Sequence, residues 1–360
     1  ILLKHQIMTY LYSTKASLFS LLLVFVLIGC KETTKAPTEI IVSGTLMEDT
    51  RWKSKTMYII DQLVTVPSGV TLTIDAGTII KANPGEATTT SMLVIAKGGK
   101  INAQGTAENP IIFTSINDDI DLKNGKDSSL SSSDVGLWGG VIILGDAPVS
   151  LQNGDDETFY TGLDPNAKAS YYGGDNSEDN SGILEYVSIR HGGIFIGTGS
   201  ESNGLTLCGV GNKTKINQIE IYANQDDGIE IFGGTVNISN LLVHACQDDG
   251  MDFDEGYTGT VDHFIVELGP DSGSGIEISG GKGASAGSFS LMNGLVDTKN
   301  APNKTPLTVD EYAVGRILNV NVDNGDVNEP LQNGSIQINV DTNGAGQVDK
   351  SAFSWTKIKS

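Results

Sequence analysis

The chain has 360 residues and a formal net charge of −21, with 23 Lys and Arg against 44 Asp and Glu. This balance argues against binding of nucleic acid, whose phosphates require basic side chains, and against docking on an anionic membrane surface. An acidic surface instead favours solubility and the binding of divalent cations.

The first 29 residues are predicted to be a lipoprotein signal segment. Lys15 supplies a positive charge, and Leu18–Ile28 is an apolar run that is too short to span a membrane. Leu27-Ile28-Gly29-Cys30 resembles the lipobox of bacterial lipoproteins, in which the Cys receives the lipid; the alternative is an ordinary signal peptide with an incidental Cys. We expect lipidation at Cys30 and a tether over residues 30–45 that holds the domain off the membrane.

The folded domain is predicted to cover residues 46–360 and to begin with short strands. Val64–Ile80 alternates apolar and polar residues between Gly turns, and Pro110–Ser115 has the composition of a further strand. Two polar segments, residues 117–134 and 153–181, interrupt this pattern and are expected to be inserted loops.

The second insert carries Tyr171 and Tyr172 among many acidic residues. Loops of this length are uncommon in compact domains unless they are functional or disordered. Two interpretations stay open: a solvated excursion between coils, or an aromatic and acidic wall beside a binding groove.

One unit of sequence occurs twice in the centre of the chain. Gln225–Ile231 (QDDGIEI) and Gln247–Phe253 (QDDGMDF) lie 22 residues apart, and each follows an apolar-x-x-apolar-x-apolar run. A period in the twenties with two strand-like runs per repeat is typical of a solenoid. Side chains alternate along a strand, so Ile229 and Ile231 are expected to point into a core and Glu230 outward. The predicted fold is all-β: a right-handed parallel β-helix in a single elongated domain.

Stacked coils place the outward acids of successive repeats about 4.8 Å apart. Such carboxylates repel one another, so some take up protons or a cation lies between them, and Ca²⁺ accepts six to eight oxygen ligands. The alternative is that the corner aspartates accept hydrogen bonds from backbone N–H groups while solvent screens the rest. The candidate metal ligands are Asp226, Asp227, Glu230, Asp248, Asp249 and Asp252.

Several stretches of the domain resemble the right-handed parallel β-helix surface lipoproteins of Bacteroidota, which are pectate-lyase-like solenoids. They are Leu72–Ile80 (LTIDAGTII), Leu93–Ser115, Gly136–Gly145 and the closing Phe353–Thr356 (FSWT). Lys31-Glu32, directly after Cys30, is similar to the short export tags of that group. The resemblance implies a location at the outer membrane, on the cell surface or on the periplasmic face, and it implies no single activity.

Two classes of function follow. The first is a non-catalytic module that binds glycan or a surface protein, for which the candidate ligand-binding residues are Arg190, Phe232, His244, Tyr171 and Tyr172. The alternative for Arg190 and His244 is a surface ion pair, which is the more common role of a lone Arg or His at a strand end.

The second class is an enzyme that degrades polysaccharides, an inverting glycosidase or a calcium-dependent lyase, with Asp227, Asp248 and Asp249 as catalytic candidates. The corner acids are similar in spacing to the motifs of polygalacturonase-type glycosidases. Ser274, however, stands where that family has a His, and no Arg-x-Lys follows.

Cys208 and Cys246 fall at different corners of different coils in this register, so no disulfide is expected between them.

Overall fold

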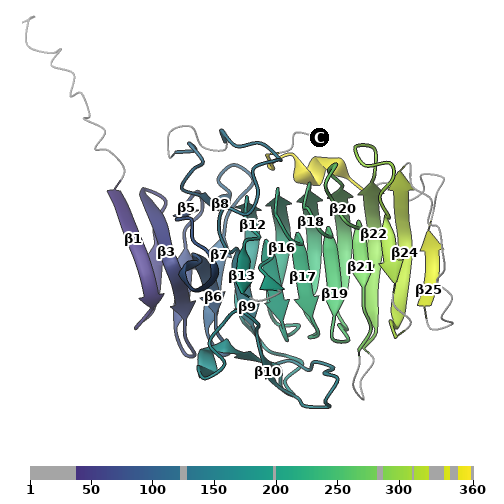
Figure 1. Ribbon diagram of the computed structural model, residues 1–360, viewed down its shortest axis with the longest axis horizontal. Helices are drawn as coiled ribbons and strands as arrows, with labels where there is room; N and C mark the ends of the chain where they lie inside the picture. The colour runs from purple at the N-terminus through teal and green to yellow at the C-terminus, as the bar shows by residue number, and fades with distance from the viewer. Residues whose placement is uncertain are drawn as a thin grey trace, which may run out of the picture. The chain divides into compact units, whose positions relative to one another are not determined.

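The computed structural model describes residues 38–121, 128–197, 200–281, 287–309, 312–323, 336–340 and 348–357, which belong to one compact unit. These residues form a right-handed parallel β-helix, as predicted (Figure 1). The main sheet has 21 strands, and every pairing within it is parallel. The described residues contain no α-helix, only the 3₁₀ turns η1 (Ala87–Thr89), η2 (Lys168–Ser170) and η3 (Lys350–Phe353).

The strands of successive coils fall into three stacks. Stack A starts with β1 (Thr38–Thr45), β3 (Thr56–Val66), β5 (Ile79–Ala82) and β8 (Ile111–Ser115). Stack B starts with β2 (Thr50–Trp52), β4 (Thr71–Ile74) and β7 (Lys100–Gln104). Stack C follows the second half of β3 and contains β6 (Met92–Ile95), β9 (Val141–Leu144), β15 (Leu205–Cys208), β17 (Ile229–Phe232), β19 (Met251–Asp254), β21 (Ile276–Ile278) and β23 (Leu307–Val309).

From the middle of the domain onward, stacks A and B are joined in single long strands. These are β12 (Gly182–Arg190), β16 (Lys215–Tyr222), β18 (Asn237–His244), β20 (Thr260–Glu267), β22 (Phe289–Asp297) and β24 (Gly315–Asp323), followed by β25 (Ile336–Val340). Each bends at one residue with positive φ in the same register, such as Gln218 (56°), Asn240 (53°) and Asn293 (53°). Asn tolerates this left-handed conformation better than most residues, and one bent strand therefore supplies two sides of the coil.

The predicted repeat register is confirmed. In stack C, Ile229 pairs with Met251 and Ile231 with Phe253, and all four side chains are buried in one core that runs through the stacked coils. Cys208 and Cys246 are both buried free thiols, as expected.

The glycine of each Gln-Asp-Asp-Gly unit is required by close packing inside this core. A Cβ added at Gly228 would lie 2.4 Å from Cγ1 of Val243, and one at Gly250 would lie 2.3 Å from Cγ1 of Val266. In both units, the space that the methyl group of an alanine would occupy is filled by a valine of the next long strand, Val243 of β18 or Val266 of β20.

The N-terminal boundary of the domain differs from the prediction. Thr38–Thr45 forms β1, which pairs with β3, so this part of the predicted tether is a strand of the β-helix. The 30–45 tether is therefore wrong from Thr38 onward, because the backbone of this segment extends stack A by pairing in parallel with β3. The signal segment, Cys30 and residues 31–37 lie outside the described residues. Among the described residues, no helix is long and apolar enough to cross a membrane.

Both predicted inserts leave the coils between strands of the sheet. In the first insert, the carboxylate of the buried Asp118 accepts hydrogen bonds from Thr114 Oγ1 (2.9 Å) and from Ser129 N (3.2 Å). The described part of this insert therefore packs against the end of β8. Residues 122–127 lie outside the described residues. The second insert contains the antiparallel pair β10 (Thr158–Phe159) and β11 (Tyr171–Tyr172), which lies below the coils in Figure 1.

The C-terminal segment covers the outside of the long strands, where η3 lies beside β18 and β20 (Figure 1). Phe353 is fully buried against Leu242, Ile265 and Leu295. The indole N–H of Trp355 donates to Oε1 of Gln218 at 2.8 Å. The closing Phe-Ser-Trp-Thr motif therefore attaches the C-terminal segment to the outer face of the long strands of the β-helix.

Candidate functional site

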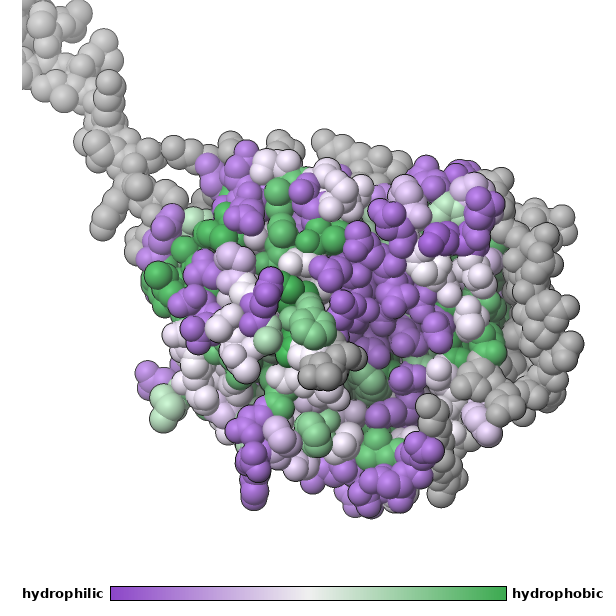
Figure 2. Space-filling view, in the orientation of Figure 1, coloured by the Kyte–Doolittle hydropathy of each residue, from purple (hydrophilic) through white to green (hydrophobic). Residues whose placement is uncertain are grey.

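The outward side chains of stack C form the predicted acid ladder. Glu230 pairs with Asp252, and Asp252 with Glu277, on consecutive coils. Along β17 and β19, buried and half-buried residues alternate, so the apolar side chains enter the core and the acids face outward. Figure 2 shows hydrophilic residues gathered over the region where β17 and β19 lie.

The two Gln-Asp-Asp-Gly units form corners between stacks A and C. Each corner begins with an alanine in the left-handed conformation, Ala223 (φ 58°) and Ala245 (φ 54°), which turns the chain out of the long strand. The first and second aspartates of each unit then have different environments: Asp227 and Asp249 are buried, Asp226 is half-buried and Asp248 is exposed.

Asp227 and Asp249 link each corner to the next coil. Oδ1 of Asp227 accepts a hydrogen bond from the backbone N–H of Asp249 at 2.9 Å. Oδ1 of Asp249 accepts one from the backbone N–H of Ser274. The interpretation of corner aspartates as acceptors for backbone N–H groups is therefore confirmed for these two residues.

Two carboxylate triads have the spacing of a cation site. In Asp226–Asp227–Asp248, and again in Asp227–Glu230–Asp252, one oxygen of each residue lies within 4.8 Å of the others. Ca²⁺ binds oxygens at 2.3–2.6 Å, so two ligands on opposite sides of the ion lie up to about 5 Å apart. The residues predicted as metal ligands are thus brought together, with the exception of Asp249, which belongs to neither triad.

Burial, followed by repulsion from neighbouring carboxylates, raises the pKa of several of these acids. The pKa rises to about 7 for Asp226 and to about 9 for Asp252. Burial also raises the pKa of Asp249 to about 7, and the pKa values of Asp227 and Glu230 are raised in the same direction. Negative charge on the ladder is therefore unfavourable, and bound protons or a cation can relieve it.

A cavity of about 350 Å³, the acidic hollow, lies between the second insert and stack C. Its aromatic side is formed by Tyr160 and Tyr172, whose ring centroids both lie 6.2 Å from that of Phe232. The Tyr172 hydroxyl donates to Glu255 at 3.1 Å. The described residues that line it are Leu151, Thr158, Phe159, Tyr160, Thr161, Tyr172, Glu201, Asp226, Glu230, Phe232 and Glu255.

This cavity supports the aromatic part of the wall interpretation of the second insert, whereas the carboxylates of its described lining come from outside the insert. Phe232 faces outward, as expected, but it is half-buried between the two tyrosines and is not an open platform. Beside the hollow lies the corner cleft, of about 480 Å³, lined by Glu201, Gln225, Gln247, Asp248 and Asp271.

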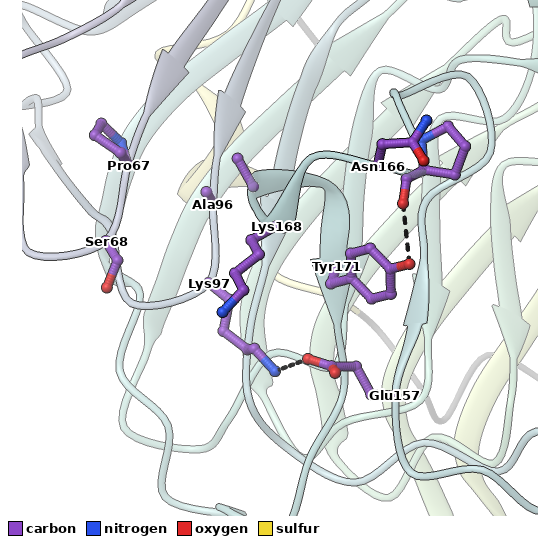
Figure 3. Close-up of a pocket in the computed structure, with 10 residues that line it drawn as sticks. Pro67, Ser68, Ala96, Lys97, Glu157, Asn166, Lys168 and Tyr171 are labelled. Atoms are coloured by element: carbon purple, nitrogen blue, oxygen red, sulfur yellow. Dashed lines mark hydrogen bonds and ion pairs between the residues drawn. The ribbon is translucent and has the colours of Figure 1, made fainter.

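Tyr171 and Tyr172 face different cavities, because side chains alternate along β11. Tyr171 lines a third cavity of about 730 Å³, the lysine hollow, on the other side of the insert. There, Lys97 Nζ forms an ion pair with Glu157, and the Tyr171 hydroxyl donates to the carbonyl of Pro165 at 3.0 Å (Figure 3). The lining is Pro67, Ser68, Ala96, Lys97, Glu157, Pro165, Asn166, Lys168, Ala169 and Tyr171.

The prediction of Arg190 as a ligand-binding residue is wrong. Its side chain is 1% exposed and forms an ion pair with Glu220, which is fully buried, at 3.0 Å. The C-terminal segment covers this pair, since the backbone N–H of Lys357 donates to Glu220. Sequence alone places Arg190 on the outward side of its strand, and only the returning chain end converts that side into an interior.

His244 also lies outside the acidic hollow. It follows Arg190 and Tyr222 in stack A, in the predicted register. Its ring stacks on Tyr222 with centroids 5.2 Å apart, and Nδ1 lies 3.0 Å from Glu267 Oε2. These contacts agree with the ion-pair interpretation of this residue.

Sequence reasoning missed Glu201, which lines both the acidic hollow and the corner cleft. It belongs to a small antiparallel pair, β13 (Phe195–Gly197) and β14 (Ser200–Glu201), between β12 and β15. This excursion has no repeat pattern in the sequence, so no signal connected Glu201 with the ladder.

The parallel coils, the three stacks and the acid ladder define a solenoid of the right-handed β-helix class. The match to a family model agrees: residues 44–353 match the pectate-lyase like beta helix domain, and the chain belongs to that family. No curated protein matches the sequence.

Proposed function

We propose that the protein is a non-catalytic binding module and that its ligand is a glycan held in the acidic hollow. The observation that carries this proposal is the conjunction of aromatic rings and carboxylates in one concave site. Sugar rings present apolar C–H faces to aromatic side chains, and their hydroxyls donate hydrogen bonds to carboxylates. A volume of about 350 Å³ lies within the range of ligand cavities in proteins.

The environment of the catalytic candidates favours binding over turnover. Asp227 and Asp249 each accept a backbone N–H from the next coil, and both are buried. Asp227 and Asp248 have carboxylate oxygens within 4.8 Å, whereas an inverting glycosidase separates its two carboxyl groups by about 6.5–9.5 Å to admit water. In the part of the chain that the structure describes, the linings of the acidic hollow and the corner cleft also contain no Lys, Arg or His to serve as the base of a lyase.

We further propose a calcium ion at the corner. Asp226, Asp227 and Asp248 have the required oxygen spacing, and Gln225 and Gln247 line the adjoining corner cleft with amide oxygens. A bound ion there offsets the repulsion between neighbouring carboxylates, which otherwise lowers the stability of the fold. Calcium should raise the melting temperature, and a chelator should reverse the increase. Asp248→Asn should abolish the calcium effect, whereas Glu108→Gln, at an exposed acid on another part of the surface, should not change it.

The location proposed for this module is the outer membrane, with the lipid at Cys30 and the domain on the cell surface; the periplasmic face is the alternative. The support is the lipobox-like Leu27–Cys30 sequence. Labelled palmitate should be incorporated into the wild-type chain and lost in Cys30→Ala. Digestion of the domain by protease added to intact cells should distinguish the surface from the periplasm.

The experiment that tests the function compares retention and turnover on the same polysaccharides. A binding module retains glycan in pull-down and calorimetric titrations, and releases neither reducing ends nor unsaturated products. Release of product that disappears in Asp249→Asn, while the folded state of that variant is preserved, would instead establish catalysis. Absence of retention on every glycan tested would contradict the proposal.

A further inference from the structure

The acidic hollow has a charge of one sign. Among the described residues, its lining has four carboxylates, those of Glu201, Asp226, Glu230 and Glu255, and no Lys, Arg or His. The lysine hollow, on the other side of the same insert, contains Lys97 and Lys168. A ligand that suits the acidic hollow therefore brings its own positive charge, and the insert separates this hollow from one of different charge.

The hollow is also aromatic, and this second property discriminates between kinds of cation. The rings of Tyr160 and Tyr172 each pack against Phe232 along one side, and Phe159 also lines the hollow. The face of an aromatic ring attracts an organic ammonium group, and cages of such rings recognise amines. A calcium ion gains little from them, because its ligands are oxygens.

One buried acceptor next to Glu230 has no donor among the described residues. Asn203 is fully buried; its Nδ2 donates to Glu230 Oε2 at 2.5 Å, while its Oδ1 has no hydrogen-bond partner. Buried polar atoms are normally satisfied, so this unsatisfied oxygen beside a carboxylate of the hollow favours a ligand that supplies N–H donors. An ammonium group supplies three.

We propose that the glycan held in the acidic hollow carries a free amino group, that is, a hexosamine residue that is not N-acetylated. The ammonium lies among the carboxylates of Glu201, Glu230 and Glu255, and the C–H face of the sugar ring packs on Phe159, whose side chain is 38% exposed in the lining. The inference rests on the proposed function, because it specifies the ligand of the same site.

The test is calorimetric titration at neutral pH with three oligosaccharides of equal length. They are a fully deacetylated glucosamine oligomer, its N-acetylated counterpart and a neutral glucose oligomer. Binding of the amino form, at least about 10-fold tighter than that of the other two, is the expected result. Equal binding of all three overturns the inference and leaves the proposed function standing, whereas binding of none contradicts both.

Two variants separate specific binding from general attraction to an acidic protein. Glu255→Gln and the exposed Glu201→Gln should each weaken binding of the amino oligomer about 10-fold or more, since a charge-assisted hydrogen bond is lost. Glu108→Gln removes the same charge elsewhere and should leave the affinity unchanged. Equal losses in all three variants would reduce the effect to surface charge and overturn the proposal. Tighter binding of a lysine-rich peptide than of the amino oligomer would also overturn it, in favour of a protein partner.

Discussion

Removal of the negative charge of Glu220 should destabilise the β-helix more than any exposed ion-pair variant. Arg190 and Glu220 are 1% and 0% exposed, and the guanidinium contacts the carboxylate at 3.0 Å through Nη2. Ser188 donates to the same carboxylate, and Nε of Arg190 lies 2.6 Å from the Ser188 hydroxyl. Arg stays protonated at all accessible pH values, so Glu220→Gln leaves a buried charge without a counter-ion.

The expected cost is about 3–5 kcal/mol of unfolding free energy, the range for breaking a buried pair by removal of one partner. Urea denaturation of the wild type, Glu220→Gln and the double variant Arg190→Met/Glu220→Met measures it. The double variant should recover part of the loss, because neither charge remains.

The matched control is Arg51→Ala. Arg51 pairs with Asp75 at 2.6 Å, but the Arg51 side chain is 62% exposed, so its removal should cost no more than about 1 kcal/mol. If Glu220→Gln proved as mild as Arg51→Ala, the placement of the Arg190–Glu220 pair in the interior would be refuted. Loss of glycan binding by a fully stable Arg190 variant would restore Arg190 as a ligand-binding residue.

Three further predictions follow from named contacts. Burial raises the pKa of Asp226 to about 7 and that of Asp252 to about 9, against an ordinary value of 3.8, so folding favours their protonated forms. The unfolding free energy of the calcium-free protein should therefore fall as the pH rises from about 4 to 9. Urea titrations at several pH values measure it, and an unfolding free energy that does not change across this window would contradict the raised pKa values of the ladder. Gly294→Ala should cost about 1–3 kcal/mol, since the added Cβ would lie 2.0 Å from Cζ of Phe264, and Phe264→Leu in the same chain should recover part of it in thermal melts. Phe353→Ala should cost about 3–5 kcal/mol in the same assay, because this side chain is fully buried under the C-terminal segment, and an unchanged melt would mean that the segment does not dock.

The sequence was most informative where the fold repeats. The spacing of Ile229, Ile231, Met251 and Phe253 was sufficient to predict the coil, because each coil packs only on its neighbours and the period therefore appears directly in the chain. The same register predicted that Glu230 lies above Asp252 and that the two free cysteines stay apart.

Prediction failed where segments leave the repeat and return to cover it. Arg190 is on an outward position of its strand, and its burial depends on Glu220 and on the chain end at Lys357, which lies far away in sequence. Glu201 enters the site from a short irregular hairpin. Tyr171 and Tyr172 are both predicted to bind ligand, but they line different cavities, because alternation along a strand places neighbouring side chains on opposite faces.

The aspartate side chains at the two corners accept hydrogen bonds in the same direction along the coils: Asp227 accepts from the backbone N–H of Asp249, and Asp249 accepts from that of Ser274. The carboxylate of each corner thus accepts a backbone N–H of the following coil. A block of 22 residues copied or excised at this place would leave each donor facing an equivalent acceptor, so tandem duplication can lengthen the rod by whole windings without a mismatch at the junction. The near-identical pair of Gln-Asp-Asp-Gly units is the pattern that such a duplication leaves behind.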